Sequence, residues 1–376
     1  MKSQLSSARM SPPKIAYKYR SHGKVRDTFE LPGDKLGIRV SNRTSTEDVI
    51  WEGGVPFKGA ALHYISNKWI RIARPLGVPT HFIKALNTKE DFKEYPELQK
   101  DYARLRGRTT IVKKLKMLPL EVIVRGNITG SGWKSYEKTG EVCGIKLPEG
   151  LKKNQFLETP IVTPTTKAEF GLHDEHVTCE QAVEILKQTA KNPEFDYYFD
   201  AEKVWHTVED YALRLFTRAR EIADKKGIIL VDTKFEFGLD LKTGAVTLGD
   251  EILTMDSSRY WDKENYKKAM AEGKDPTSMD KEGLRVYGYG LSARGKWDKS
   301  QENAPKIPRE MAWNMGGIYL TTCRRLFGTN DPIIEEMWAE YEAHKRRQQR
   351  LRRKRYLREK QRKGQIVVDR HIRLVR

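Results

Sequence analysis

Cysteines and long apolar runs are the features that this sequence has least of. Three cysteines occur among 376 residues, at Cys143, Cys179 and Cys323. Their spacing matches no metal-ligand set, and three thiols do not make a disulfide framework. No apolar run approaches the roughly 20 residues needed to span a bilayer, and residues 1–13 lack the apolar centre of a secretory signal. We therefore predict a cytoplasmic protein with reduced thiols and no membrane partner.

Acidic residues are fewer than basic residues, but most of the basic excess lies in one segment. The chain has 70 Lys and Arg against 51 Asp and Glu, a formal net charge of +19. Residues 341–376 alone hold 15 basic and three acidic residues and so carry +12 of this charge, which leaves +7 for the first 340 residues. We interpret the basic character as a property of this tail. The net charge of the first 340 residues does not indicate a nucleic-acid binder.

Strand-like and helix-like segments interleave irregularly along the chain, which favours an α+β fold. Residues 36–40 and 120–124 alternate apolar with other side chains, as half-buried strands do. Apolar residues at helical spacing within 62–72 predict a helix that ends before Pro75. Internal repeats are not visible.

Two further helices are predicted in the middle of the chain. Thr178 and Gln181 have the spacing of a capping box that opens a helix to about Lys191. An apolar stripe within residues 204–222 predicts a long helix closed by Gly227. We expect four parts: an N-terminal β-rich domain (1–116), a central α+β domain (117–304), a C-terminal helical segment (305–340) and the basic tail (341–376).

A β-hairpin is predicted within residues 231–253. Two strand-like runs are separated by Lys242-Thr243-Gly244, a glycine-containing turn. If the turn centres on Thr243, Glu236 lies directly opposite Asp250. Because side chains alternate along a strand, one face of the first run carries Asp232, Lys234 and Glu236.

Carboxylates that face each other across a strand pair repel unless a cation lies between them. Mg²⁺ binds few carboxylates together with nucleotide phosphate oxygens. One interpretation is that Glu236 and Asp250 hold the Mg²⁺ of ATP, with Lys234 near the transferring phosphoryl group. The alternative is a surface ladder of ion pairs in which Lys234 neutralises both acids.

Two glycine-containing loops have the composition of phosphate sites. Lys24 follows Gly23 in a turn that could close over nucleotide phosphates, or could be an ordinary solvated turn. Residues 125–132 combine Arg125, three glycines and Ser131 at a helix entry, where backbone N–H groups favour phosphate. The alternative for this segment is a glycine-rich helix-entry turn without a ligand.

Two more segments could reach the same cleft. Arg259 follows the hairpin closely, although Asp256 or Ser257 could instead cap a helix there. His173 and Asp174 lie in a polar loop of the kind that positions substrates, or form a structural loop contact.

With these motifs in chain order, the sequence resembles the phosphoribosylaminoimidazole-succinocarboxamide synthase (SAICAR synthetase) family. The similarity runs from about Gly23 to Arg285. It rests on Gly23-Lys24-Val25-Arg26-Asp27, Val124-Arg125-Gly126, Thr129-Gly130-Ser131-Gly132-Trp133, Thr163-Pro164-Thr165-Thr166-Lys167-Ala168-Glu169, Asp232-Thr233-Lys234-Phe235-Glu236-Phe237-Gly238 and Asp256-Ser257-Ser258-Arg259.

The resemblance implies an ATP-grasp-like fold with ATP bound between two β-containing portions. It also implies an ATP-dependent carbon–nitrogen ligase of de novo purine biosynthesis, with ATP and Mg²⁺ as cofactors. Its substrates would be L-aspartate and carboxyaminoimidazole ribonucleotide, whose carboxylate would react through an acyl phosphate.

Expected residue roles follow from the matched positions. The residues near the reacting centre would be Asp232 and Lys234. ATP would be held by Lys24, Arg26, Glu236 and Asp250, the last two also binding the metal. The nucleotide 5′-phosphate would contact Arg125, Ser131 and Arg259. The remaining substrate contacts would come from Ser45, Asp48, Lys167, His173, Asp174, Lys281 and Arg285.

The sequence departs from the family pattern at a few positions. An early family motif reads Asp-Arg-Ile-Ser-Ala-Phe-Asp, and here Asn42 and Glu47 alter its charges while Asp48 is kept. Asn127 replaces a common aromatic residue, and Met255 replaces a usual proline. These changes bear on substrate identity more than on reaction type.

Two rival functions stay open on the sequence. One is a related ATP-dependent ligase that acts on a modified nucleotide or another amine, motivated by the altered residues 42–47. The other is nucleic-acid binding through residues 341–376, whose basic clusters could neutralise several phosphates. Against nucleic-acid binding, Tyr356 is the only aromatic residue in the core of the tail. A solvated helix or a disordered extension fits the sequence equally well. Oligomeric state is not predicted.

Overall fold

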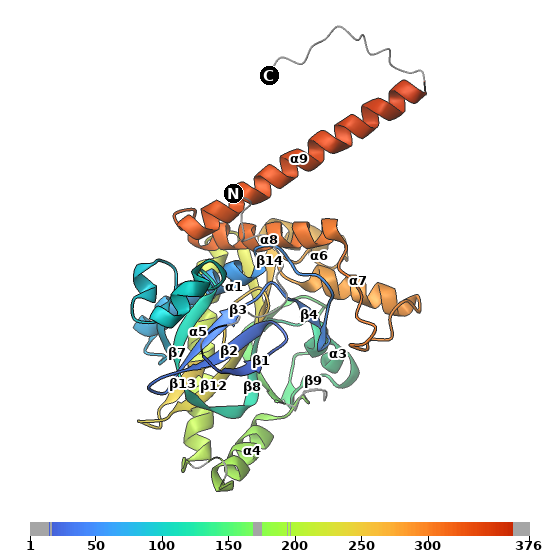
Figure 1. The fold of residues 1–376 in the computed structure, drawn as a ribbon. Helices are drawn as coiled ribbons and strands as arrows, with labels where there is room; N and C mark the ends of the chain where they lie inside the picture. Colours follow the sequence, from blue (N-terminus) through green and yellow to red (C-terminus); the bar gives the residue numbers. More distant parts are fainter. Residues whose placement is uncertain (1–14, 16, 168–174, 194, 196, 364–376) are drawn as a thin grey trace.

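The computed structural model describes residues 15, 17–167, 175–193, 195 and 197–363. Within these residues the chain forms two five-stranded sheets, both antiparallel, with helices packed around them (Figure 1). The N-terminal sheet has the order β1-β2-β3-β7-β6. Its strands are β1 (Tyr19–His22), β2 (Arg26–Leu31), β3 (Lys35–Val40), β7 (Thr109–Lys113) and β6 (Phe82–Ala85).

The central sheet is organised around one long buried strand, β12. This strand pairs with β8 on one side and with both β13 and β14 on the other, and β11 extends the sheet beyond β8. The strands are β11 (Phe156–Thr166), β8 (Leu115–Asn127), β12 (Ile228–Asp240), β13 (Val246–Gly249) and β14 (Ser258–Asp262). Side chains on β12 therefore have neighbours from three other strands.

Two small hairpins and several helices complete the body. The hairpins are β4–β5 (Ser45–Thr46, Val49–Ile50) and β9–β10 (Glu141–Val142, Ile145–Lys146). The helices of the body are α1 (Lys58–Ala73), α2 (Tyr102–Leu105), α3 (Gly130–Thr139), α4 (Cys179–Lys191), α5 (Ala201–Asp224), α6 (Lys263–Ala271) and α7 (Glu282–Ala293), with 3-10 turns at Arg74–Leu76, Glu90–Phe92 and Pro96–Asp101.

The core lies between the central sheet and its covering helices. Helix α5 buries Val208, Leu215 and Phe216 in the same cluster as Val122 and Phe235 of the sheet. These side chains are at most 2% exposed, and each contributes roughly 1.5–3 kcal/mol by leaving water. The rigid packing of β8 and β12 against α5 provides the support on which polar residues of the opposite face are held.

Several local predictions are confirmed. Helix α4 begins with the full capping box of Thr178 and Gln181, and α5 matches the predicted long helix, with Gly227 in the left-handed region after it. The first predicted helix is α1, which ends at Ala73. β12 begins at Ile228, before the predicted hairpin, and continues through the first strand of that hairpin.

Two helices follow the body, α8 (Arg309–Phe327) and α9 (Pro332–Arg362). Asp331 starts α9 by accepting hydrogen bonds from the N–H groups of Ile333 and Ile334. The helix runs unbroken across position 340, where the basic tail was expected to begin, and its distal half projects away from the sheets (Figure 1). Among the described residues, every helix is too short or too polar to traverse a bilayer.

Candidate active site

The hairpin forms, but its register differs by one residue from the predicted one. Glu236 lies opposite Gly249 instead of Asp250, so that prediction was wrong. The loop contains four residues, because the Gly244 N–H bonds to the Asp240 carbonyl at 2.9 Å and the Asp240 carboxylate accepts from the N–H groups of Lys242 and Thr243. A loop with an even number of residues has no single central residue. The strand pairing is therefore shifted by one residue from the pairing expected for a turn centred on Thr243.

A second carboxylate does face Glu236, from the other neighbouring strand. Glu121 of β8 is its direct partner in the sheet, and both acids are buried. Lys234 ion-pairs with Glu121 and lies 3.6 Å from Glu236, and Lys167 ion-pairs with Glu236. The cations that separate these two facing carboxylates are therefore the ammonium groups of Lys234 and Lys167, as in the ion-pair alternative, although one of the acids is Glu121 and not Asp250.

Asp250 lies just beyond β13, in a left-handed conformation (φ 50°). Its carboxylate contacts Arg26 at 2.5 Å, and Arg26 also ion-pairs with Glu251. Burial alone would raise the pKa of Asp250, but the positive charges of Arg26, Lys234 and Lys167 lower it to about 2. The negative charges of Glu236 and Asp250 thus both act to raise the pKa of Lys167 and of Lys234.

A pair of arginines surrounds Asp232 on the same face of β12. In the sheet, Asp232 lies between Arg125 of β8 and Arg259 of β14. Arg259 contacts its carboxylate at 2.5 Å, and Arg125 lies 3.9 Å away. Arg259 is therefore on a strand, and the alternative that Asp256 or Ser257 caps a helix there was wrong.

This cluster meets the N-terminus of α3, the segment for which a phosphate site was predicted. The buried Arg125 donates to the hydroxyl of Ser131 at 3.1 Å and to that of Thr163 at 2.9 Å. A Cβ on Gly130 would come within 2.8 Å of the Arg259 guanidinium. Two guanidinium groups, one carboxylate and a helix N-terminus leave a net positive site suited to a phosphate dianion.

Lys24 lies close to the small β4–β5 hairpin. Its ammonium contacts Asp48 at 2.5 Å, while Arg43 donates to the carbonyl of Gly23 at 3.0 Å and holds the loop. Asp48 and Glu47 both have positive φ, which makes the tight turn between the two strands. Ser45 lies in β4, which packs beside α7.

The start of α7 joins the arginine cluster through Glu282. This carboxylate lies 2.7 Å from Arg285 and 3.8 Å from Arg259. Lys281 precedes the helix, and burial is the main cause that lowers its pKa to about 8, with the charges of Arg285 and Lys58 adding to the effect and that of Asp256 opposing it. Arg285 therefore lies beside the arginine cluster, whereas Lys281 interacts with Asp256, Lys58 and Glu251 as well as with Arg285.

Ten of the predicted site residues form two groups at one face of the central sheet, whereas Lys24, Asp48 and Ser45 lie at the β4–β5 hairpin. The first contains Arg26, Lys167, Lys234, Glu236 and Asp250, and the second contains Arg125, Ser131, Asp232, Arg259 and, through Glu282, Arg285. His173 and Asp174 lie outside the described residues.

Among the buried charged residues that sequence reasoning missed, two lie next to predicted site residues. Glu121 was hidden in an apolar strand pattern, where a lone acid among Leu120, Val122 and Val124 was the available signal. The other is Lys58, which is fully buried and pairs with Asp256 at 2.7 Å.

The departures from the family pattern have structural roles. Asn42 is buried, and its Oδ1 accepts from the N–H of Gly59 at the start of α1 and from Arg108. Glu47 pairs with Lys299 at 2.8 Å. Asn127 donates to the carbonyl of Asn154. Met255 is fully buried.

Comparison with known proteins gives matches to one family over most of the chain. The SAICAR synthetase family model matches residues 19–302. Phosphoribosylaminoimidazole-succinocarboxamide synthases from Maridesulfovibrio salexigens and Geobacter sulfurreducens are each 42% identical, over 81% and 83% of this chain and 91% and 95% of theirs. A solved structure of SAICAR synthase from Saccharomyces cerevisiae, complexed with SAICAR, is 34% identical with a TM-score of 0.72, and the alignment covers 87% of this chain and all of that one.

The matched region contains both clusters of the candidate site. The covered share of each relative is large, so the similarity extends well beyond isolated motifs. The chain belongs to the SAICAR synthetase family of carbon–nitrogen ligases of purine biosynthesis.

Proposed function

We propose that this enzyme joins L-aspartate to the carboxylate of carboxyaminoimidazole ribonucleotide, using ATP and passing through an acyl phosphate. The observation that carries the proposal is the placement of two chemically different clusters on one face of β12. Asp232, with its two arginines, and Glu236, with its two lysines, lie four residues apart on that strand. A phosphorylated substrate and a nucleoside triphosphate could thus be held side by side.

The arginine cluster would bind the 5′-phosphate of the ribonucleotide. Arg125 and Arg259 offer forked donors, and Ser131 and the first N–H groups of α3 complete the anion site. Lys281 and Arg285 would hold carboxylates of the substrates nearby. The yeast structure that contains SAICAR supports a site for this class of nucleotide in the family.

The lysine and carboxylate cluster would bind Mg-ATP. Glu236 and Asp250 are two carboxylates around a shared pair of lysines, a donor set that fits Mg²⁺ because this ion takes one or two protein carboxylates together with phosphate oxygens. When bound there, the ion would supply positive charge that offsets the charge of the ATP phosphates. Arg26 holds Asp250 in place, and Lys24 would contact the phosphates from the opposite sheet.

This assignment places ATP between the N-terminal sheet, which carries Lys24 and Arg26, and the central sheet, as in ATP-grasp-like enzymes. Lys167, Ser45 and Asp48 would complete the substrate contacts. The three cysteines are unpaired, which fits the predicted cytoplasmic location.

A carboxylate does not react with an amine at neutral pH because its leaving group would be oxide. Transfer of the terminal phosphoryl group of ATP to the carboxylate makes phosphate the leaving group, which the aspartate amine then displaces. The residues of this site would position the two substrates, and Lys234 would offset the charge that develops on the transferring group.

An assay of ADP release with carboxyaminoimidazole ribonucleotide and aspartate tests the proposal. ADP release should require both substrates, and omission of either should reduce it to background. Product mass spectrometry with aspartate, glycine or glutamate separates this function from ligation of another amine. ADP release that does not depend on the nucleotide would refute the assignment.

A further inference from the structure

The distal half of α9 carries a dense positive charge that the rest of the described chain does not neutralise. Residues 345–363 contain eight arginines, four lysines and one acid. In the described part of the chain, no ion pair or hydrogen bond is formed by the side chains of Arg346, Arg347, Arg350, Arg353, Lys354, Arg355, Arg358 and Arg362. These cations make no contribution to the site described above.

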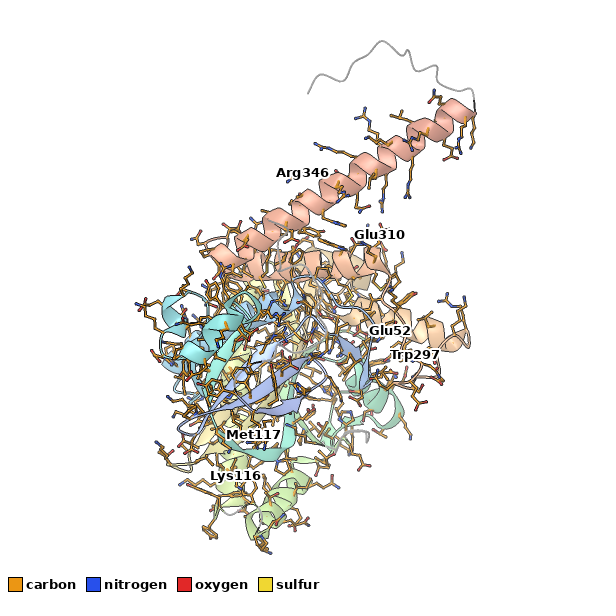
Figure 2. All side chains as sticks on the ribbon, viewed as in Figure 1. Glu52, Lys116, Met117, Trp297, Glu310 and Arg346 are labelled. Atoms are coloured by element: carbon orange, nitrogen blue, oxygen red, sulfur yellow. The ribbon has the colours of Figure 1, made fainter. Side chains whose placement is uncertain are left out.

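The first turns of α9 pack against the body of the protein, and the charged half extends from them. Ile333, Ile334 and Met337 are buried, and the ring of His344 stacks on Trp313 of α8 with centroids 3.6 Å apart. Arg352 reaches back to Glu310. The distal half of the helix leaves the body, and its side chains, including the labelled Arg346, extend into solvent on several sides (Figure 2).

The charge pattern opposes helix formation in the absence of an anion. Arg346, Arg350, Lys354, Arg358 and Arg362 recur every four residues, which places like charges next to each other along about 24 Å of helix. A ligand with regularly spaced negative charges would reverse this repulsion.

The side chains around α9 indicate which kind of polyanion fits. The exposed apolar residues of this segment, Leu351, Tyr356 and Leu357, do not fall on one helical face, so there is no stripe to enter a membrane surface or an apolar protein groove. Basic side chains occur on every side, with twice as many arginines as lysines, and arginine binds phosphate in a forked geometry. This segment has one exposed aromatic ring, which is too few to stack on successive bases.

We propose that the distal half of α9 is a binding element for duplex nucleic acid, which it contacts through backbone phosphates without reading sequence. A helix is 10–12 Å wide, and a duplex groove presents phosphates on both of its flanks, which matches cations on all sides of the helix. This function is separate from the ligase reaction and does not rest on it.

Fluorescence anisotropy of labelled 20-base-pair duplexes with the full-length protein tests the proposal. The wild type should bind with an affinity that falls steeply with salt. Replacing Arg346, Arg350, Lys354, Arg358 and Arg362 by Gln should weaken binding at least about 100-fold at low salt and reduce the salt slope by about 2 to 4, since each lost phosphate contact removes about 0.9. ADP release should be unchanged.

Two matched variants separate the possible reasons for such a loss. Lysine at the same five positions keeps the charge and should retain the salt slope. Gln at five exposed lysines of the body removes the same net charge and should leave binding within about threefold; these are Lys89, Lys93, Lys100, Lys267 and Lys274. Equal loss in this control, tighter binding to single strands, or tighter binding to phosphatidylserine vesicles would overturn the proposal.

Discussion

At the scale of single residues, Glu236 is a carboxylate with charged side chains of both signs next to it. Glu121 faces it in the sheet, and Lys234 and Lys167 offset the two charges. We expect Glu236→Gln to lower the rate of ADP release by at least about 100-fold, because the amide keeps the shape but loses the charge that would bind the metal. Steady-state kinetics and a thermal melt, to show that the fold is retained, are the measurements.

Glu121→Gln is the matched control for this change. It removes one charge from the same lysine without altering the proposed metal ligand, so its rate should fall by about tenfold or less. Equal losses in both variants would show that Glu236 acts only by neutralising Lys234, and near-normal turnover of Glu236→Gln would refute the metal assignment.

Arg125 is expected to act on nucleotide binding more than on turnover. Arg125→Lys keeps the charge but loses the forked contacts, so the KM for the ribonucleotide should rise about tenfold or more while kcat changes less. Arg220→Lys, on α5 and outside both clusters, serves as the control. An unchanged KM would contradict the phosphate role.

Asn42 offers a test of one departure from the family pattern. Its Oδ1 accepts from Gly59 at the N-terminus of α1 and from Arg108, while its Nδ2 is buried with no partner in the described part of the chain. Asn42→Asp would remove that unsatisfied donor and place a negative charge beside both groups. We expect a gain of about 1 kcal/mol in the free energy of unfolding at pH 7, measured by urea titration.

The pH dependence of this gain has a definite sign. Because the gain depends on the negative charge of the introduced carboxyl group, it should be present at pH 7 and shrink as that group is protonated at acidic pH. Asn42→Ala is the reference and should lower stability by about 1 kcal/mol. A loss of stability in Asn42→Asp at pH 7 would contradict this account.

At the scale of elements, the hairpin turn depends on Asp240. Burial alone would raise its pKa, but hydrogen bonds from Lys113 and from the N–H groups of Lys242 and Thr243 lower it to about 2. Its contribution to stability is therefore complete above about pH 4 and lost as the pH falls toward 2. Because Lys113 is half exposed, we expect Asp240→Asn to cost only about 1 kcal/mol at pH 7.

Urea titrations at pH 7 and pH 3 test this prediction. The difference between wild type and Asp240→Asn should shrink at the lower pH, and a Lys113→Gln variant should show part of the same effect. A difference that stays constant between the two pH values would show that the carboxylate charge does not hold the turn.

Local elements were the most predictable part of the fold. The α4 capping box and the buried stripe of α5 are encoded within a few helical turns, and both formed as expected. The hairpin was predicted, but its register was not, because the Asp240 side chain and the left-handed Gly244 select a four-residue loop. That choice depends on side-chain hydrogen bonds that periodicity does not report.

At the scale of the whole molecule, α9 is anchored along one half and extends into solvent along the other. The ring of Tyr341 packs on Gly317 of α8, where a Cβ would lie 2.3 Å from it, and His344 stacks on Trp313. Removing residues 353–376 should therefore leave the melting temperature and ADP release unchanged. Removing residues 341–376 should lower the free energy of unfolding by about 2 kcal/mol, because these ring contacts are lost.

Thermal melts and ligase assays of the two truncations make this comparison. Equal melting temperatures would show that the contacts between α8 and α9 add nothing. A loss of turnover in the shorter truncation would mean that the distal helix takes part in the reaction.

The sequence by itself determined the helices, the motif residues and the family, because these follow from spacing within short segments. Only the tertiary structure decided that Glu121 faces Glu236 and that Asp232 lies between Arg125 and Arg259. Except for Arg259, these partners are more than 100 residues apart in the chain, so no local pattern relates them. Their pairing is selected when β8, β12 and β14 assemble against α5, since register in a buried sheet is set by the packing of all its strands together.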